Sequence, residues 1–306
     1  MDKPLSFSGI CTFNNYPFTR SLNCTDIAIM GIPFDQGTTN RSGARMGPRA
    51  IREISSAVFP FNYKWDCEKF SLDIACPNII DYGDVGASFG NQSIHVMMSE
   101  SYEHAKHILS SGSALLSLGG DHTIPYGPVR AASEQYGKLA LIHFDSHQDS
   151  APSNGNYSHA NFAYDLAQEG CIDPTHSVQV YIRTNFENCG YQIIYADEAL
   201  EITPRELALK IKKIVGDMPV YLTFDIDALD PAYAPGTGTP VCGGPSTYEV
   251  GQVLRNLEGI HLIAADITEV APAYDHSQIT ALAAAHVAQD ILCLIAKDRM
   301  KRNVND

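Results

Sequence analysis

Side chains of the kinds that bind metal ions follow one apolar run of the sequence at every second position. The run LALIHFD (139–145) ends with Asp145, and His147 and Asp149 come next. Side chains of a β-strand point alternately to opposite faces, so residues i and i+2 share a face at roughly 6.5–7 Å. If the run is a strand, Asp145 and His147 converge on one side of the sheet.

Two other apolar runs end in residues of the same kinds. His122 follows SALLSLGGD (113–121), Asp225 closes PVYLTFD (219–225), and Asp227 lies two residues further on. Ligands of open parallel sheets bind at the carboxyl ends of the strands, and neighbouring strands lie only about 5 Å apart. Side chains from two such strands could enclose two metal ions roughly 3.5–4 Å apart, the separation of known two-metal sites.

Charge favours two ions over one. The cluster contains four carboxylates: Asp145, Asp149, Asp225 and Asp227. Unpaired carboxylates in a partly buried site are costly, whereas two divalent cations cancel their charge. Carboxylates with a minority of imidazoles favour hard ions such as Mn²⁺ over structural Zn²⁺. We therefore expect a binuclear centre with a cationic substrate.

Some of these residues also have purely structural interpretations. Asp230 precedes Pro231 and could serve only as a turn or helix cap, and His122 taken alone could be a hydrogen-bonded loop histidine. His143 lies inside the apolar run, so we interpret it as a core histidine or one that supports a metal ligand from behind. The joint pattern favours the metal site, because both acidic groups follow core strands.

Eight short apolar runs lack the alternation of half-exposed strands, which is typical of strands buried on both faces of a parallel sheet. They span residues 26–34, 77–84, 113–121, 139–145, 177–183, 192–197, 219–225 and 261–267. Helix-like stretches lie between them, at residues 47–58, 93–112, 203–216, 246–257 and 277–297, and the last is Ala-rich and amphipathic. The alternation predicts an α/β fold with a mainly parallel sheet. We take residues 1–306 as a single domain; the alternative is two halves that divide near residue 150.

Composition excludes some functions. The chain of 306 residues has 44% hydrophobic and 18% charged residues and a formal net charge of −14. Nucleic-acid binding needs a basic surface, so that class is not expected. The eight cysteines form no CxxC pair, the N-terminus lacks an apolar signal-peptide core, and no run approaches the roughly 18 apolar residues of a membrane span. We expect a cytoplasmic protein that binds no membrane.

Long stretches of the chain resemble the ureohydrolases, the arginase and agmatinase family, and most closely its agmatinase branch. The motifs are SGARMGPRAIR (42–52), LGGDHTIPYG (118–127), HFDSHQD (143–149), YLTFDIDALDPAYAPGTGTPVCGG (221–244) and EVAPAYDHSQITALAAAH (269–286). The resemblance implies a three-layer α/β/α fold, two Mn²⁺ per chain, and hydrolysis of a guanidino group to urea plus an amine. It also implies a homo-oligomer, a trimer or hexamer.

The resemblance assigns roles to residues of this sequence. One metal would be held by His122, Asp145, Asp149 and Asp225, and the other by His147, Asp145, Asp225 and Asp227, so that Asp145 and Asp225 bridge. Glu269 matches the carboxylate that binds the guanidinium, and His159 matches a histidine that moves protons or orients substrate. Metal ions lower the pKa of water towards neutrality, and Asp149 or His159 could then protonate the leaving amine.

This chain departs from the family pattern near the site. His159 is followed by Ala160 and Asn161, where the family has Gly and a small hydroxyl residue or Gln, and Asn161 would lie near the substrate entrance. Ser146 and Gln148 replace the Ala and Thr more usual among agmatinases. The departures remove no ligand but leave the substrate open.

The leading hypothesis is hydrolysis of agmatine to putrescine and urea. Agmatine is a dication, so its far end should meet an acid; Glu187 is a candidate, although a solvated loop acid is the simpler interpretation. A second hypothesis is hydrolysis of another guanidino compound, such as the acid 4-guanidinobutanoate. A third is a non-catalytic, metal-binding descendant of the fold.

Overall fold

A computed structural model describes residues 8–58, 77–85 and 93–305 of the chain. Eight strands form one sheet in the order β2-β1-β3-β8-β7-β4-β5-β6, and every neighbouring pair is parallel. The strands are β1 (Ile27–Ile32), β2 (Ile79–Asp84), β3 (Ala114–Gly119), β4 (Ala140–Phe144), β5 (Val178–Ile182), β6 (Gln192–Tyr195), β7 (Pro219–Asp225) and β8 (His261–Thr268). Each coincides with a predicted apolar run.

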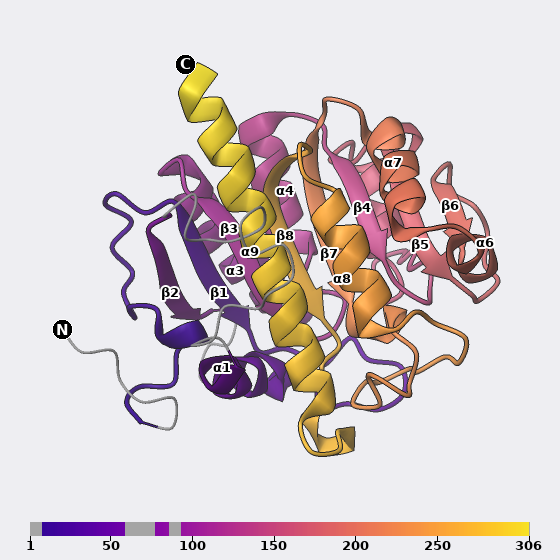
Figure 1. The fold of residues 1–306 in the computed structure, drawn as a ribbon, viewed down its shortest axis with the longest axis horizontal. Coiled ribbons are helices and arrows are strands. Elements are labelled where there is room, and N and C mark those ends of the chain that lie inside the picture. The colour runs from indigo at the N-terminus through magenta and orange to yellow at the C-terminus, as the bar shows by residue number, and fades with distance from the viewer. Residues whose placement is uncertain (1–7, 59–76, 86–92, 306) are drawn as a thin grey trace.

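Helices cover both faces of the sheet (Figure 1). One face carries α1 (Gly47–Val58), α7 (Pro204–Val215), α8 (Thr247–Asn256) and α9 (Ile279–Asn305), and the other carries α3 (Ile94–Ser110), α4 (Tyr126–Tyr136) and α5 (Phe162–Gln168). Strand side chains alternate between two separate cores: Ile27 and Ile29 pack with the first group of helices, whereas Ala28 and Met30 pack with the second. The expected three-layer α/β/α fold is confirmed.

Local sequence signals begin the helices where they were predicted. Thr203 caps α7 and Ser246 caps α8, each in a capping box with the glutamate three residues later, Glu206 and Glu249. Each box satisfies backbone N–H groups that the first helical turn leaves without intrahelical partners. Three short helices were not predicted: α4, α5 and α6 (Ala196–Glu201).

The last helix differs from its prediction. It extends from Ile279 to Asn305, beyond the predicted end at 297, and residues 280–298 are mostly buried on all sides rather than on one face. The reason is tertiary packing, because α9 lies on the sheet between α1 and α8 (Figure 1). The expectation that no run is long enough to span a membrane was wrong for this helix, because by length and composition alone it could do so. However, 78% of its apolar window is buried inside the fold, as in a core helix.

The strand order positions the predicted site. β3, β8, β7 and β4 lie side by side, so their carboxyl ends meet at one edge of the sheet. Strands from before and after residue 150 interleave there, and a division at that residue would cut through the sheet.

Candidate functional site

The candidate site is built on the ends of these four central strands. Asp145 follows β4 directly, Asp225 is the last residue of β7, and Glu269 follows β8. Because β4 pairs with β7, and Asp225 lies opposite Thr268 of β8, the three carboxylates arrive at the same edge. His122 comes from the loop after β3 and is completely buried.

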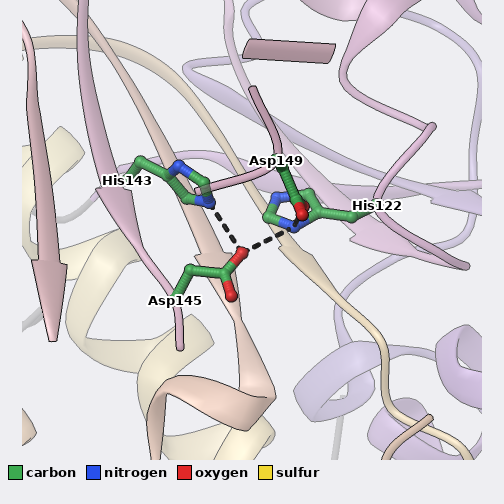
Figure 2. A group of neighbouring side chains, drawn as sticks. All are labelled: His122, His143, Asp145 and Asp149. Atoms are coloured by element: carbon green, nitrogen blue, oxygen red, sulfur yellow. Dashed lines mark hydrogen bonds and ion pairs between the residues drawn. The ribbon is translucent and has the colours of Figure 1, made fainter. Parts of the chain in front are cut away.

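Three carboxylate oxygens surround one nitrogen of His122. The Nδ1 atom lies 2.9 Å from Asp149 Oδ2, 3.1 Å from Asp145 Oδ2 and 3.2 Å from Asp225 Oδ2. Figure 2 shows the imidazoles of His122 and His143 both directed at the Asp145 carboxylate, with Asp149 beside His122. The four predicted ligands of the first metal are thus brought together.

A second cluster uses the other oxygen of Asp145. The His147 Nδ1 atom lies 3.3 Å from Asp145 Oδ1 and 3.1 Å from Asp227 Oδ2. Asp145 therefore stands between two histidines, with Oδ2 facing His122 and Oδ1 facing His147. This is the arrangement expected of a carboxylate that bridges two cations.

The buried carboxylates of the cluster favour a positive charge bound between them. Burial, followed by the negative charges of Asp227 and Asp145, raises the pKa of the Asp225 carboxyl well above its usual range. Burial opposes a positive charge on His147, yet its hydrogen bonds to Asp145 and Asp227 prevail and raise the pKa of the imidazole to about 12. A field that holds a proton this firmly also favours a metal cation at the same place.

The donor set fits divalent cations. His122 Nδ1 is buried and makes no hydrogen bond of acceptable geometry, despite its three carboxylate neighbours. Its other ring nitrogen, Nε2, is engaged with the Thr223 hydroxyl at 2.8 Å, which leaves Nδ1 available as a ligand. Carboxylate oxygens with a few imidazoles, His122 and His143 in the first cluster and His147 in the second, suit hard or borderline divalent ions.

Glu269 lies directly beside the metal-type cluster. Its side chain is fully buried, and its Oε1 atom accepts hydrogen bonds from the His122 backbone N–H (2.9 Å) and from His159 Nδ1 (2.8 Å). Its Oε2 atom is buried without a hydrogen-bond partner. A Cβ atom placed at Gly238 would lie 3.3 Å from that oxygen, so the glycine keeps this side open.

Backbone strain coincides with the site. Glu269 has a φ of 63° and Asp149 has a φ of 46°, both in the left-handed region that non-glycine residues rarely adopt. Such conformations cost roughly 1–3 kcal/mol and cluster at functional sites. Two of the predicted catalytic residues are thus held in unfavourable backbone conformations by the surrounding fold.

His159 is fixed through both ring nitrogens. Nδ1 contacts Glu269, while Nε2 lies 3.1 Å from the Thr39 backbone nitrogen and 2.7 Å from the Thr39 hydroxyl. Burial disfavours the charged imidazole, but the hydrogen bond to Glu269 and the charge of that carboxylate prevail and raise the pKa of His159 to about 9. Thr39 was not predicted, since only the fold brings its loop to residue 159.

The two remaining predicted contacts lie apart from this centre. Asn161 Oδ1 accepts from the Ser158 N–H and hydroxyl, both at 2.7 Å, and its Nδ2 donates to the Ala151 carbonyl at 2.9 Å, so the side chain braces the loop that carries His159. The Glu187 side chain is exposed, and its backbone carbonyl accepts from Gln148 and Ser150, both at 3.4 Å. Substrate contacts for both residues stay predictions.

The geometry also bears on the alternative interpretations of His143 and Asp230, and His143 lies within the first acid–histidine cluster. His143 is fully buried, and its Nε2 atom lies 2.7 Å from Asp145 Oδ2, so it supports a candidate ligand from behind. Asp230 accepts backbone N–H groups of Ala232, Gly243 and Gly244, which is the turn role considered for it.

Arg183 is a supporting residue that the sequence did not reveal. Its guanidinium donates to backbone carbonyls of residues 181, 227, 228, 229 and 241. It thereby holds the turn after Asp225 against β5. It is the last residue of the predicted apolar run 177–183, but its partners are carbonyls that only the fold assembles.

Comparison with known proteins gives consistent results. The family model described as the arginase family matches residues 25–294. The agmatinase of Photorhabdus laumondii is 44% identical over 275 residues, which is 89% of this chain and 87% of that protein. The crystal structure of a hypothetical agmatinase from Burkholderia thailandensis is 43% identical with a TM-score of 0.89, and covers 98% of this chain and 93% of its own.

A solved structure named for a different activity is also similar. The proclavaminate amidino hydrolase of Streptomyces clavuligerus is 33% identical with a TM-score of 0.87, over 96% of this chain and 99% of its own. The family match covers most of the chain, and the paired acid–histidine clusters lie at the strand ends where the sequence motifs placed them. The chain belongs to the arginase family, as an agmatinase-type ureohydrolase.

Proposed function

We propose that this chain hydrolyses the guanidino group of agmatine to give putrescine and urea. The observation that carries the proposal is the buried, unpartnered Oε2 atom of Glu269 next to two acid–histidine clusters. Similarity to agmatinases at 42–45% identity supports the choice of substrate. The net charge of −14 suits a dicationic substrate.

The residues divide the work by position. His122, Asp145, Asp149 and Asp225 would hold one divalent cation, and His147, Asp145, Asp225 and Asp227 the other. When bound, the cations supply Lewis-acid activation of water at neutral pH. Glu269 Oε2 accepts an N–H of the planar guanidinium, while the two donors on Oε1 keep the carboxylate in place.

The proton of the reaction needs a carrier at the site. Asp149 lies 2.9 Å from His122 Nδ1, and its side chain is 11% exposed. We assign it to accept a proton from the attacking water and deliver it to the leaving amine. His159 holds Glu269 through Nδ1, and its Nε2 atom is engaged with Thr39.

A second substrate is favoured by one comparison. The amidino hydrolase from Streptomyces clavuligerus shares the fold at 33% identity, so chains of this fold act on more than one amidino compound. A guanidino acid such as 4-guanidinobutanoate is therefore the alternative for this chain. The non-catalytic alternative has less support, since every predicted ligand and Glu269 lie together in the fold.

We further propose two Mn²⁺ per chain, a cytoplasmic location and a role in polyamine synthesis through putrescine. Hard oxygen donors support Mn²⁺. The cysteines in the described part of the chain, six in number, are free, as expected in a reducing compartment. The family resemblance supports a homo-oligomer, a trimer or hexamer, which gel filtration with light scattering would test.

The direct test is urea release by the Mn²⁺-loaded protein from agmatine, arginine, 4-guanidinobutanoate and 3-guanidinopropanoate in parallel. We expect agmatine to be turned over with the highest kcat/KM. Turnover of a guanidino acid in its place would assign the selectivity to the loop around Asn161. No urea from any substrate, with two ions bound, would refute the proposed hydrolysis.

A further inference from the structure

A buried carboxylate lies beneath the site, inside the sheet. Asp266 belongs to β8 and is 0% exposed, between strands whose other side chains are largely apolar. Its oxygens accept hydrogen bonds from two hydroxyl groups: Tyr221 at 2.6 Å and Thr223 at 2.5 Å, both on β7. Burying a carboxylate here is costly, and an apolar side chain would suit the core better. Packing alone therefore does not account for a carboxylate at residue 266.

The hydrogen bonds continue from Asp266 to the candidate metal ligand. Thr223 lies opposite Asp266 in the β7–β8 register, and its Oγ1 atom also lies 2.8 Å from His122 Nε2. A hydroxyl group has only one hydrogen to donate. Because that hydrogen goes to Asp266, the Thr223 oxygen accepts from His122, and Nε2 must carry the ring proton.

The consequence falls on the opposite nitrogen of the ring. With the proton on Nε2, Nδ1 presents its lone pair to the space between three carboxylate oxygens at 2.9–3.2 Å. In the other tautomer, Nδ1 would carry a hydrogen and could not bind a cation. A nearby carboxylate also raises the basicity of a metal-binding imidazole.

We propose that Asp266 and Thr223 are positioning residues that hold His122 in its metal-binding tautomer. They thereby strengthen the binding of the ion at His122. The proposal rests on the proposed metal centre. It concerns only the ion at His122, because the hydrogen-bond relay from Asp266 through Thr223 ends at that histidine. The cluster around His147 and Asp227 is held by other hydrogen bonds, from Ser146.

The experiment compares Mn²⁺ binding by the full chain and its variants, with free Mn²⁺ measured by electron paramagnetic resonance. Thr223→Val keeps the shape of the side chain but removes the relay. We expect one of the two dissociation constants to rise about 10- to 100-fold, the usual effect of such supporting residues, while the other is unchanged. Asp266→Asn should raise the dissociation constant of the same ion.

Two variants serve as matched controls. Thr223→Ser restores the hydroxyl and should bind both ions as the unaltered chain does. Ser117→Ala removes a buried hydroxyl opposite Asp266 on β3 that has no hydrogen-bond partner, so it should also leave both constants unchanged. Circular dichroism shows whether each variant is folded.

The outcomes separate this inference from the metal centre itself. If Thr223→Val bound both ions with the same dissociation constants as the unaltered chain, the inference alone would be overturned. The same conclusion would follow if both dissociation constants rose equally, because that indicates general damage to the site. Failure of the unaltered chain to bind Mn²⁺ would overturn the proposed centre, and the relay with it.

Discussion

At the scale of single residues, the site is defined by atoms that the fold leaves without partners. His122 Nδ1 and Glu269 Oε2 are both buried and both lack a hydrogen bond. Unsatisfied buried polar atoms are destabilising. These two differ from the unpartnered Ser117 hydroxyl because they lie beside the acid–histidine clusters, where a bound ligand could satisfy them. The first atom faces carboxylates and suits a cation; the second is itself a carboxylate oxygen and suits a guanidinium.

Removal of Glu269 should separate binding of metal from turnover. Glu269→Ala leaves every predicted metal ligand in place, so the metal content should be unchanged. A buried charged partner of the substrate is lost, and kcat/KM should fall by about 100-fold or more. Metal analysis and urea release on the same sample check this. Loss of metal in the variant would contradict the assignment.

Glu187 should act on substrate binding alone. If its exposed carboxylate meets the distal amine of agmatine, Glu187→Gln removes a solvent-screened ion pair of at most about 1 kcal/mol. KM should then rise up to about fivefold with kcat unchanged, as steady-state kinetics would show. An unchanged KM would mean that the side chain is a solvated loop acid.

At the scale of elements, buried or partly buried ion pairs join helices to the sheet and to each other. Arg52 of α1 contacts Asp81 of β2 at 2.8 Å, with side-chain exposures of 7% and 1%. Asp290 of α9 contacts Arg255 of α8 at 3.2 Å. Each pair fixes one element relative to its neighbour. We predict that the first contributes to the stability of the fold and that the second makes this stability depend on pH.

Arg52→Met should destabilise the fold strongly. The substitution leaves the Asp81 carboxylate buried without its cation, which costs about 3–5 kcal/mol. Arg49→Met, on an exposed position of the same helix, is the matched control and should change stability by no more than about 0.5 kcal/mol. Urea unfolding gives both values; equal values for the two variants would contradict the role of the pair.

The carboxyl of Asp290 should make stability depend on pH. Burial raises its pKa to about 6, above the value near 3.9 of an unfolded chain, although Arg255 opposes the shift. The folded chain then binds this proton more tightly, so the free energy of unfolding falls as pH rises from about 4 to about 6, by about 3 kcal/mol from this group. Asp290→Asn should lack that contribution. Parallel pH profiles of the two proteins, measured by urea unfolding, would refute it.

At the scale of the whole molecule, strand order determines what the sequence could and could not predict. The eight strands follow a local rule, because an apolar run forms a buried strand, and the candidate ligands lie at the strand ends as expected. The strand spacing expected for Asp145 and His147 was wrong, since β4 ends at Phe144 and both residues lie in the loop that follows it. Lateral neighbours are not local. Asp266 and Thr223 meet only because β8 lies beside β7, so their relay to His122 could not be read from either strand alone.

The same limit applies to loops and to the last helix. Thr39 reaches His159 across 120 residues of sequence, and Arg183 finds its carbonyl partners in turns after other strands. Helix α9 looked amphipathic, but the fold surrounds it with the sheet, α1 and α8 and buries nearly its whole circumference. Tertiary contacts override local pattern in each case.

The central claim is that a binuclear metal centre hydrolyses agmatine, and one titration tests it most directly. Metal-free protein is loaded stepwise with Mn²⁺, and bound Mn²⁺ per chain and urea released from agmatine are measured at each step. The account predicts that urea release follows occupancy and reaches its plateau at two ions per chain. Full urea release by the metal-free protein, or none at two bound ions, would contradict it.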